Sequence, residues 1–376
     1  MIYLDNAATT KPNENALTIA NEINTAIYFN PSARYKGGIK AKNVVDTARD
    51  SFKKVFGSNF DVIFTSCGSE SDNTAIFSYT KRGNAVTTLG EHSAVYEPFM
   101  ALKNSGYDAR FSKILKDGSV DVKDLLSKID NNTTFVSVVH VNNETGAIND
   151  INAIAKQVKK INPRIVFHSD GVQAFGKIKV NLSSDIDLYS VSAHKIGGLK
   201  GVGLLLKNKK LNNLKPLILG GGQEFALRSG TENVFGIRVF ELATLDKTQN
   251  LNDNYTKVQN LKKSFIDKLD KDIFTIISGE NSSPYVLSLS ASGLRGEVLQ
   301  HMLEEDDIYI GTGSACSSKH PHSRVLTSAG YTPKMLDGVV RISFSSDNTL
   351  EEIEYAVSKL NEKALKLKKA MIVWIK

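Results

Sequence analysis

Short apolar runs alternate with helical patterns over the first two thirds of the chain, and this alternation limits the possible folds most strongly. The strand-like runs lie at 62–65, 85–89, 135–139, 164–169, 187–191 and 203–206. The run 135–139 is almost continuously apolar, which is typical of a strand buried on both faces of a sheet. Helical spacing between the runs, as in 151–158, predicts an α/β fold with a mostly parallel, helix-covered sheet.

The pattern changes after about residue 250, where helices and strands no longer alternate regularly. Strands are predicted at 285–290 and 338–343, and Thr349 with Glu352 forms a capping box for a final helix. We therefore predict a large domain, residues 11–250, and a smaller α+β domain. The smaller domain combines residues 1–10 and 251–376, and the polar stretch 247–255 is the predicted boundary.

Composition excludes several classes of protein. No apolar run approaches the length needed to cross a bilayer, and the first residues lack a signal-peptide pattern. Two cysteines are too few for a disulfide framework, so reduced thiols and a cytoplasmic location are expected. The net charge of +7 is scattered and no nucleic-acid motif is visible. We expect neither membrane nor direct nucleic-acid binding.

Two charged residues at the ends of apolar runs suggest covalent cofactor chemistry. Lys195 follows the run 187–191 in Ser-Ala-His-Lys, before a glycine-rich loop. A lysine that is partly desolvated there would be an amine able to react with an aldehyde. Asp170 ends the neighbouring run 164–169. A carboxylate to pair a ring nitrogen and a lysine to hold an aldehyde are what pyridoxal phosphate (PLP) requires.

Other candidates follow strands of the predicted sheet, where α/β proteins bind ligands. Gly68 and Ser69 precede a helix and suit a phosphate, although Ser69 could simply be a helix cap. His92 could stack on an aromatic cofactor or move protons. Asn143 could bind a ring oxygen or be an ordinary turn residue.

The second half of the chain adds a reactive-thiol candidate and an arginine. Cys316 lies in a Gly/Ser-rich loop, 311–323, which predicts an accessible thiol. With His320 and His322 it does not match a structural zinc pattern, so no metal is expected. Arg341 lies in an apolar strand and needs an anion, either a substrate carboxylate or an internal salt bridge.

Nine motifs, in order along nearly the whole chain, resemble the NifS-type cysteine desulfurases of the class V aminotransferase family. They lie at 3–10, 30–32, 65–73, 91–92, 142–146, 168–173, 192–195, 228–231 and 313–316. The resemblance implies the PLP-dependent transferase type I fold. Its large domain has a mostly parallel seven-stranded sheet, and a smaller α+β domain carries the catalytic cysteine loop.

The resemblance also implies a role for each matching residue. Lys195 would bind PLP covalently, Cys316 would be the sulfur-accepting nucleophile, and His92 would stack on the ring and assist proton transfer. Asn143 and Arg341 would orient the substrate. The remaining cofactor contacts would come from Asp170 at the ring nitrogen, Gln173 at the ring hydroxyl oxygen, Gly68, Ser69, Ser192 and His194 at the phosphate, and Thr231 of a second subunit.

The implied reaction removes sulfur from L-cysteine, giving L-alanine and a persulfide on Cys316. The implied partners are a second copy of the chain, in a homodimer, and a sulfur acceptor, either an iron–sulfur cluster scaffold or a tRNA-thiolation relay. Two alternatives stay open: another class V PLP enzyme, such as a selenocysteine lyase or aminotransferase, and a non-catalytic sulfur-assembly partner. The departures from the family pattern are Cys67, Tyr35, Leu199 and Phe225.

Overall fold

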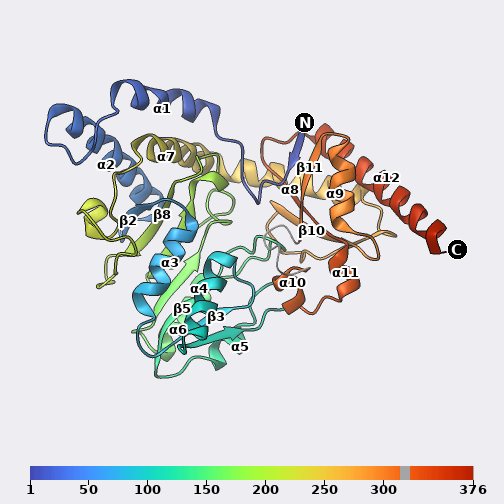
Figure 1. Ribbon diagram of the computed structural model, residues 1–376, viewed down its shortest axis with the longest axis horizontal. Coiled ribbons are helices and arrows are strands. Elements are labelled where there is room, and N and C mark those ends of the chain that lie inside the picture. The colour runs from blue at the N-terminus through green and yellow to red at the C-terminus, as the bar shows by residue number, and fades with distance from the viewer. Residues whose placement is uncertain (314–321, 376) are drawn as a thin grey trace.

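Two β-sheets, each covered by helices, make up the structure (Figure 1). The computed structural model describes residues 1–313 and 322–375. One sheet has seven strands, all from the segment 60–208, and the other has five strands, from residues 2–4 and 274–343. No helix in the described ranges is both long and apolar enough to cross a membrane.

The seven-stranded sheet is mostly parallel, as predicted. Strand β8 is antiparallel to both of its neighbours, and the other adjacent strands run parallel. In spatial order the strands are β2 (Phe60–Thr65), β8 (Gly203–Asn208), β7 (Leu188–Ser192), β6 (Val166–Asp170), β5 (Thr133–Ser137), β3 (Asn84–Thr88) and β4 (Asp108–Ser112). The carboxyl ends of β3, β5, β6 and β7 therefore meet at one edge.

Helices cover both faces of this sheet because its strands are apolar on both sides. Helices α3 (Gly68–Tyr79) and α4 (Ser93–Asn104) contribute to the core on one face. Helices α2 (Lys36–Phe56), α6 (Ile151–Ile161) and α7 (Val234–Gln249) contribute to the core on the other. The remaining elements of this half are α1 (Glu14–Ala26), α5 (Val122–Ser127), and the 3₁₀ turns η1 (Ala193–Lys195) and η2 (Gln223–Ala226).

The five-stranded sheet includes a strand from the N-terminal segment. Strand β1 (Ile2–Leu4) pairs in parallel with β11 (Ile308–Thr312) at one end of the sheet. Beyond β11 follow β12 (Val339–Ser343), β10 (Val286–Ala291) and β9 (Phe274–Ile276), all antiparallel to their neighbours. The segment after β1 can therefore pass from the smaller sheet towards the larger one.

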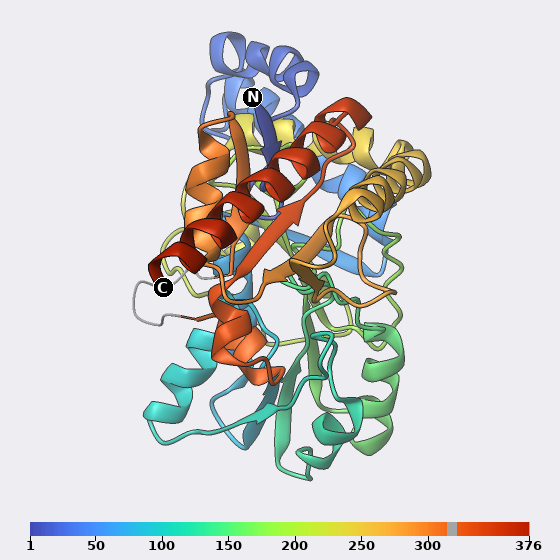
Figure 2. The same cartoon turned by 90° about the vertical axis from the view of Figure 1, so that its right-hand side faces the viewer.

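Three helices share a core with the smaller sheet, and α12 is the longest of them (Figure 2). They are α8 (Leu251–Lys268), α9 (Gly296–Glu304) and α12 (Leu350–Ile375). The predicted capping box starts α12: Thr349 Oγ1 accepts from the Glu352 N–H at 3.2 Å, and the Glu352 carboxylate accepts from the Thr349 N–H at 3.1 Å. Short helices α10 (Arg324–Ser328) and α11 (Pro333–Asp337) precede β12.

Several element boundaries differ from the predictions. Strand β5 ends at Ser137, so the apolar residues 138–139 continue past it in buried, non-strand backbone. The polar stretch 247–255, predicted as the domain boundary, is helical except at Asn250, which lies between α7 and α8. The predicted cysteine loop starts later than residue 311, because β11 continues to Thr312. The domain limits at residues 10 and 250 stay a prediction.

Candidate active site

The lysine and the carboxylate predicted to act together lie at the ends of adjacent parallel strands. Asp170 is the last residue of β6 and pairs in register with Ser190 of β7. Lys195 follows β7 in the turn η1. Parallel neighbours end at the same edge of a sheet, so the fold brings these two side chains to one place.

Asp170 is buried and forms no salt bridge with the basic residues that the structure describes. Its Oδ1 accepts from the Val172 N–H at 2.9 Å. Burial raises the pKa of Asp170 to about 7, and the nearby Asp72 carboxyl acts in the same direction, whereas Lys195 lowers it. A cation or a protonated nitrogen brought next to Asp170 would therefore stabilise its ionised form.

Lys195 contacts the segment that follows β1. Its Nζ donates to the carbonyl oxygens of Ala7 and Ala8, each at 2.7 Å. The Ala7 N–H in turn donates to Ser343 Oγ of β12 at 2.9 Å. This turn therefore connects the smaller sheet to the lysine of the larger one.

His92 is held as a neutral imidazole of defined tautomer. It precedes α4, and its Nδ1 accepts from the Ala94 N–H at 3.1 Å, which leaves the proton on Nε2. Burial lowers the pKa of His92 to about 4, and Lys195, Arg324 and Arg341 act in the same direction. A flat, uncharged ring suits stacking on an aromatic cofactor.

The start of α3 and the end of β7 form a cradle suited to a phosphate. Gly68 is the first residue of α3, where backbone N–H groups and the helix dipole favour anions. A Cβ at Gly68 would lie only 2.7 Å from Val172 Cγ2. Ser192 Oγ is buried and has no hydrogen-bond partner in the described part of the chain. A phosphate oxygen would satisfy this hydroxyl.

The other two predicted phosphate contacts, Ser69 and His194, follow Gly68 and Ser192 closely in the chain. Ser69 is not the helix cap, because Cys67 occupies that position and makes no side-chain capping bond. Ser69 is exposed in the first turn of α3 instead. His194 Nδ1 lies 3.1 Å from Thr9 Oγ1, and burial lowers the His194 pKa to about 4.

Gln173 is buried between a carbonyl and an amine. Its Nε2 donates to the Ala7 carbonyl at 2.8 Å, and its Oε1 accepts from Lys177 Nζ at 2.8 Å. The Ala7 carbonyl thus accepts from both Gln173 and Lys195, which brings the two predicted cofactor contacts to one atom.

The sequence allowed Asn143 to be an ordinary turn residue, but the side chain that stabilises this turn is that of Asn142. Asn142 Oδ1 accepts from the N–H groups of Glu144 and Thr145, each at 2.8 Å, and its Nδ2 donates to the Gly90 carbonyl. Asn143 contributes its backbone carbonyl, which accepts from Arg341 at 3.0 Å.

Arg341 forms the internal salt bridge that was one of its two sequence-based interpretations. Its Nη2 lies 2.8 Å from Asp5 Oδ1. The Nε atom is buried without a hydrogen-bond partner in the described ranges. Binding of a substrate carboxylate by Arg341 stays a prediction.

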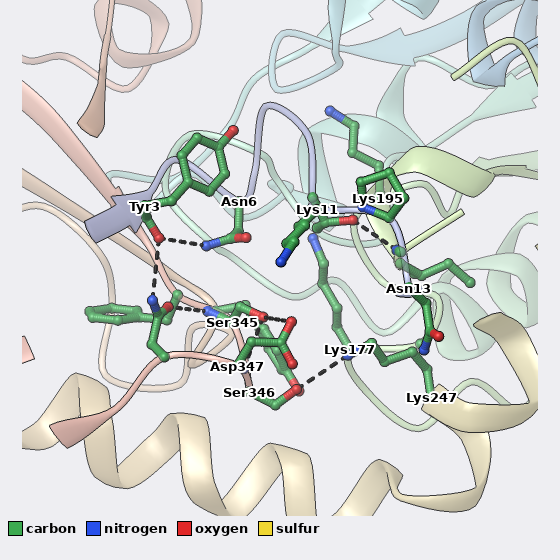
Figure 3. A pocket seen from close by; sticks show the side chains of 18 of the residues that line it. Tyr3, Asn6, Lys11, Asn13, Lys177, Lys195, Lys247, Ser345, Ser346 and Asp347 are labelled. Atoms are coloured by element: carbon green, nitrogen blue, oxygen red, sulfur yellow. Dashed lines mark hydrogen bonds between the residues drawn. The ribbon is translucent and has the colours of Figure 1, made fainter. Parts of the chain in front are cut away.

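Two predicted residues are not brought to this site by the described chain. Thr231 is exposed and lines a separate groove of about 320 Å³ beside Tyr28 and Pro31. Cys316 lies outside the described residues. A cavity of about 520 Å³ lies next to the site rather than in it: Lys195 lines it, but Asp170, His92 and Arg341 do not (Figure 3).

The described residues fit PLP. A helix start and an unpartnered serine hydroxyl suit its phosphate, a buried carboxylate suits its ring nitrogen, and a lysine amine suits its aldehyde. A neutral imidazole and a buried amide complete the polar surroundings.

Sequence reasoning missed three buried titratable residues: Asp72 and Glu91, near Asp170, and Lys177 behind Gln173. Burial raises the pKa of Asp72 to about 7 and that of Glu91 to about 8. Asp72 and Glu91 lie in the quoted motifs 65–73 and 91–92, so the motifs pointed to the right segments without distinguishing these side chains.

Comparison with known proteins gives full-length matches. A profile described as Aminotransferase class-V matches residues 2–356. A NifS/IcsS protein homolog of Lactobacillus delbrueckii subsp. bulgaricus is 37% identical, with 96% of this chain and 97% of that protein covered. The cysteine desulfurase IscS of Buchnera aphidicola subsp. Baizongia pistaciae is 35% identical, with 99% and 95% covered. A solved structure titled NIFS-LIKE PROTEIN is 33% identical, with a TM-score of 0.90 and 97% and 100% covered.

Proposed function

We propose a detailed activity from one premise: the chain belongs to the class V aminotransferase family, and it is a cysteine desulfurase of the NifS type. The substrate is cysteine, and the finer proposal is that PLP serves as cofactor and Cys316 receives the sulfur. The observation that carries it is the position of Lys195 and Asp170, which lie at the same ends of two adjacent parallel strands.

The proposal assigns a task to each described residue. PLP, when bound, would supply an electron sink for the α-carbon of the substrate. Asp170 would hold a proton on the ring nitrogen, and Lys195 would accept the proton that leaves the substrate's α-carbon. His92, neutral with its proton on Nε2, would lie against the ring.

The sulfur step is proposed for Cys316. Its thiolate would form a bond to the substrate sulfur while the bond from that sulfur to Cβ breaks, and protonation of the carbon product would complete alanine. The sulfur would then pass to an iron–sulfur scaffold or a tRNA-thiolation relay, the two acceptors considered above. We also propose that these steps take place in the cytoplasm.

A homodimer is the proposed working form, with Thr231 completing the site of the second copy. Large apolar side chains are exposed near this residue: Leu219 and Phe225 precede it in the chain, and Tyr28 lines the same groove. An exposed apolar surface of this kind supports an interface. Sedimentation should give twice the mass of the chain, and a monomer at working concentration would contradict the dimer.

The decisive experiment compares Cys316→Ala with Cys67→Ala, the other cysteine of the chain. Purified parent protein, incubated with PLP, L-cysteine and a reductant, should release alanine and sulfide. Cys316→Ala should keep the visible colour of bound PLP and lose sulfide release, whereas Cys67→Ala should retain both. Normal sulfide release from Cys316→Ala would refute the proposed role, and transamination with a keto acid would favour an aminotransferase.

A further inference from the structure

Lys177 is a buried amine that the proposed reaction does not use. Its side chain is 5% exposed, and Nζ donates to Gln173 Oε1 at 2.8 Å. Burial lowers the pKa of Lys177 to about 7, and the charges of Lys195, Arg341 and Lys247 act in the same direction. Burial of a lysine amine destabilises the folded protein unless hydrogen bonds compensate for the lost water. Here the side-chain amide of Gln173 accepts such a bond, so we ask what Lys177 does for Gln173.

The bonding partners of Gln173 determine which way its amide faces. Below its pKa of about 7 the Lys177 amine is an ammonium group, which can only donate, so the acceptor Oε1 of Gln173 must face it. On the other side Nε2 donates to the Ala7 carbonyl, which can only accept. A rotated amide would place oxygen against oxygen at Ala7 and N–H against N–H at Lys177. Two independent contacts therefore select one orientation.

This orientation decides what Gln173 can offer to the cofactor. An amide nitrogen has two N–H bonds, and the Ala7 carbonyl takes one of them. The second can be donated to a ring oxygen, and donation stabilises that oxygen in its ionised form. In the opposite orientation the amide would present a carbonyl oxygen, which would repel it.

We propose that Lys177 is a positioning residue, which holds the Gln173 amide so that it donates a hydrogen bond to the ring oxygen of PLP. The inference rests on the proposed function, because it requires PLP at this site. Lys177 acts from behind: it lines the cavity beside the site, together with Lys195 (Figure 3), and reaches the cofactor only through Gln173.

The test is a double-mutant cycle on the full chain, with Lys177→Met, Gln173→Leu and the double variant. PLP-free protein is titrated with PLP, and the dissociation constant and the position of the visible absorption band are measured. Lys177→Met should weaken PLP binding about tenfold and move the band, since one hydrogen bond to an ionised oxygen is lost or reversed. The double variant should bind no more weakly than Gln173→Leu alone.

Matched variants separate positioning from folding. Lys179→Met removes an exposed lysine two residues away and should leave both readouts unchanged. Lys177→Arg keeps a donor-only cation and should restore the parental band, which a purely structural role would not require. Thermal unfolding of each PLP-free variant checks the fold.

The outcomes distinguish this inference from the proposed function. If the parent protein fails to bind PLP, both are overturned. If the parent binds PLP but Lys177→Met keeps the parental band and affinity, only the role of Lys177 is overturned. Additive losses from Lys177→Met and Gln173→Leu would overturn it as well, because the two residues would then act separately.

Discussion

Asp72 provides the sharpest test of the electrostatics of this site. The residue lies in α3 and is 1% exposed, and the nearby Ser190 hydroxyl offsets only part of the cost of ionising its carboxyl group. Burial raises the pKa of Asp72 from 3.8 to about 7. His168 Nε2 lies 3.4 Å away, but burial lowers the His168 pKa to about 4. Between these two pKa values the contact therefore joins two uncharged groups.

The sign of the effect on stability follows from proton binding. Between pH 3.8 and about 7 the folded protein keeps a proton on Asp72 that the unfolded chain has released. Stability therefore falls as the pH rises through this range. At roughly 1.4 kcal/mol per pH unit, the loss is about 2 kcal/mol at about pH 5 and about 4 kcal/mol at about pH 8.

The perturbation is Asp72→Asn, which keeps the shape of the side chain and removes its titration. In urea unfolding of the PLP-free protein, the variant should be more stable than the parent by about 2 kcal/mol near pH 5. Near pH 8 this difference should grow to about 4 kcal/mol. The gain includes an easier ionisation of Asp170, because Asp72 contributes to raising the Asp170 pKa.

An exposed position provides the control for this measurement. Asp50→Asn, on α2, removes the same charge at the protein surface, where the carboxylate is 68% exposed. That variant should follow the parent at every pH. If the free energy of unfolding depends on pH equally in the parent and in Asp72→Asn, the argument that a buried, protonated carboxyl group lies near Asp170 is refuted.

Two further predictions concern stability away from the site. Arg49 pairs with Glu224 through two buried contacts of 2.7 and 2.8 Å, so Arg49→Met should cost about 3–5 kcal/mol by leaving the carboxylate unpaired. Urea unfolding measures this cost, the added change Glu224→Gln should recover part of it, and a cost below about 1 kcal/mol would contradict the reasoning. Thr349→Ala removes the hydroxyl of the capping box and should destabilise α12 by about 1 kcal/mol, seen as a lower Tm. Thr349→Ser should have the same Tm as the parent. An unchanged Tm in Thr349→Ala would show that the capping box does not contribute to stability.

The sequence predicted the larger sheet well because its buried strands have a strong apolar signal. Strand β4 was missed because Asp108–Ser112 is polar and lies at the sheet edge. The pairing of strand β1 with β11 depends on residues 308–310, far along the chain. Local patterns carry no information about such partners.

The candidate site was predicted where residue type and strand position agree, as for Asp170 and Lys195. The partners of these residues could not be predicted, because they come from distant segments. Arg341 forms a salt bridge with Asp5, and Gln173 donates to the Ala7 carbonyl, although these partners lie more than 150 residues apart in the chain. The burial of Asp72 and Lys177 has the same origin: a polar residue in a helix or turn is exposed or enclosed according to what packs over it.

The position of β1 has a consequence for biosynthesis. Residues 2–4 pair with residues 308–310, which are translated about 300 residues later. At roughly 5–20 residues per second, this segment waits about 15–60 s for its partner strand. The Ala7 and Ala8 carbonyls that receive Lys195 belong to the same waiting segment. These contacts of Lys195 are therefore completed only when the nascent chain is almost fully made, and earlier ribosome-bound forms would lack them.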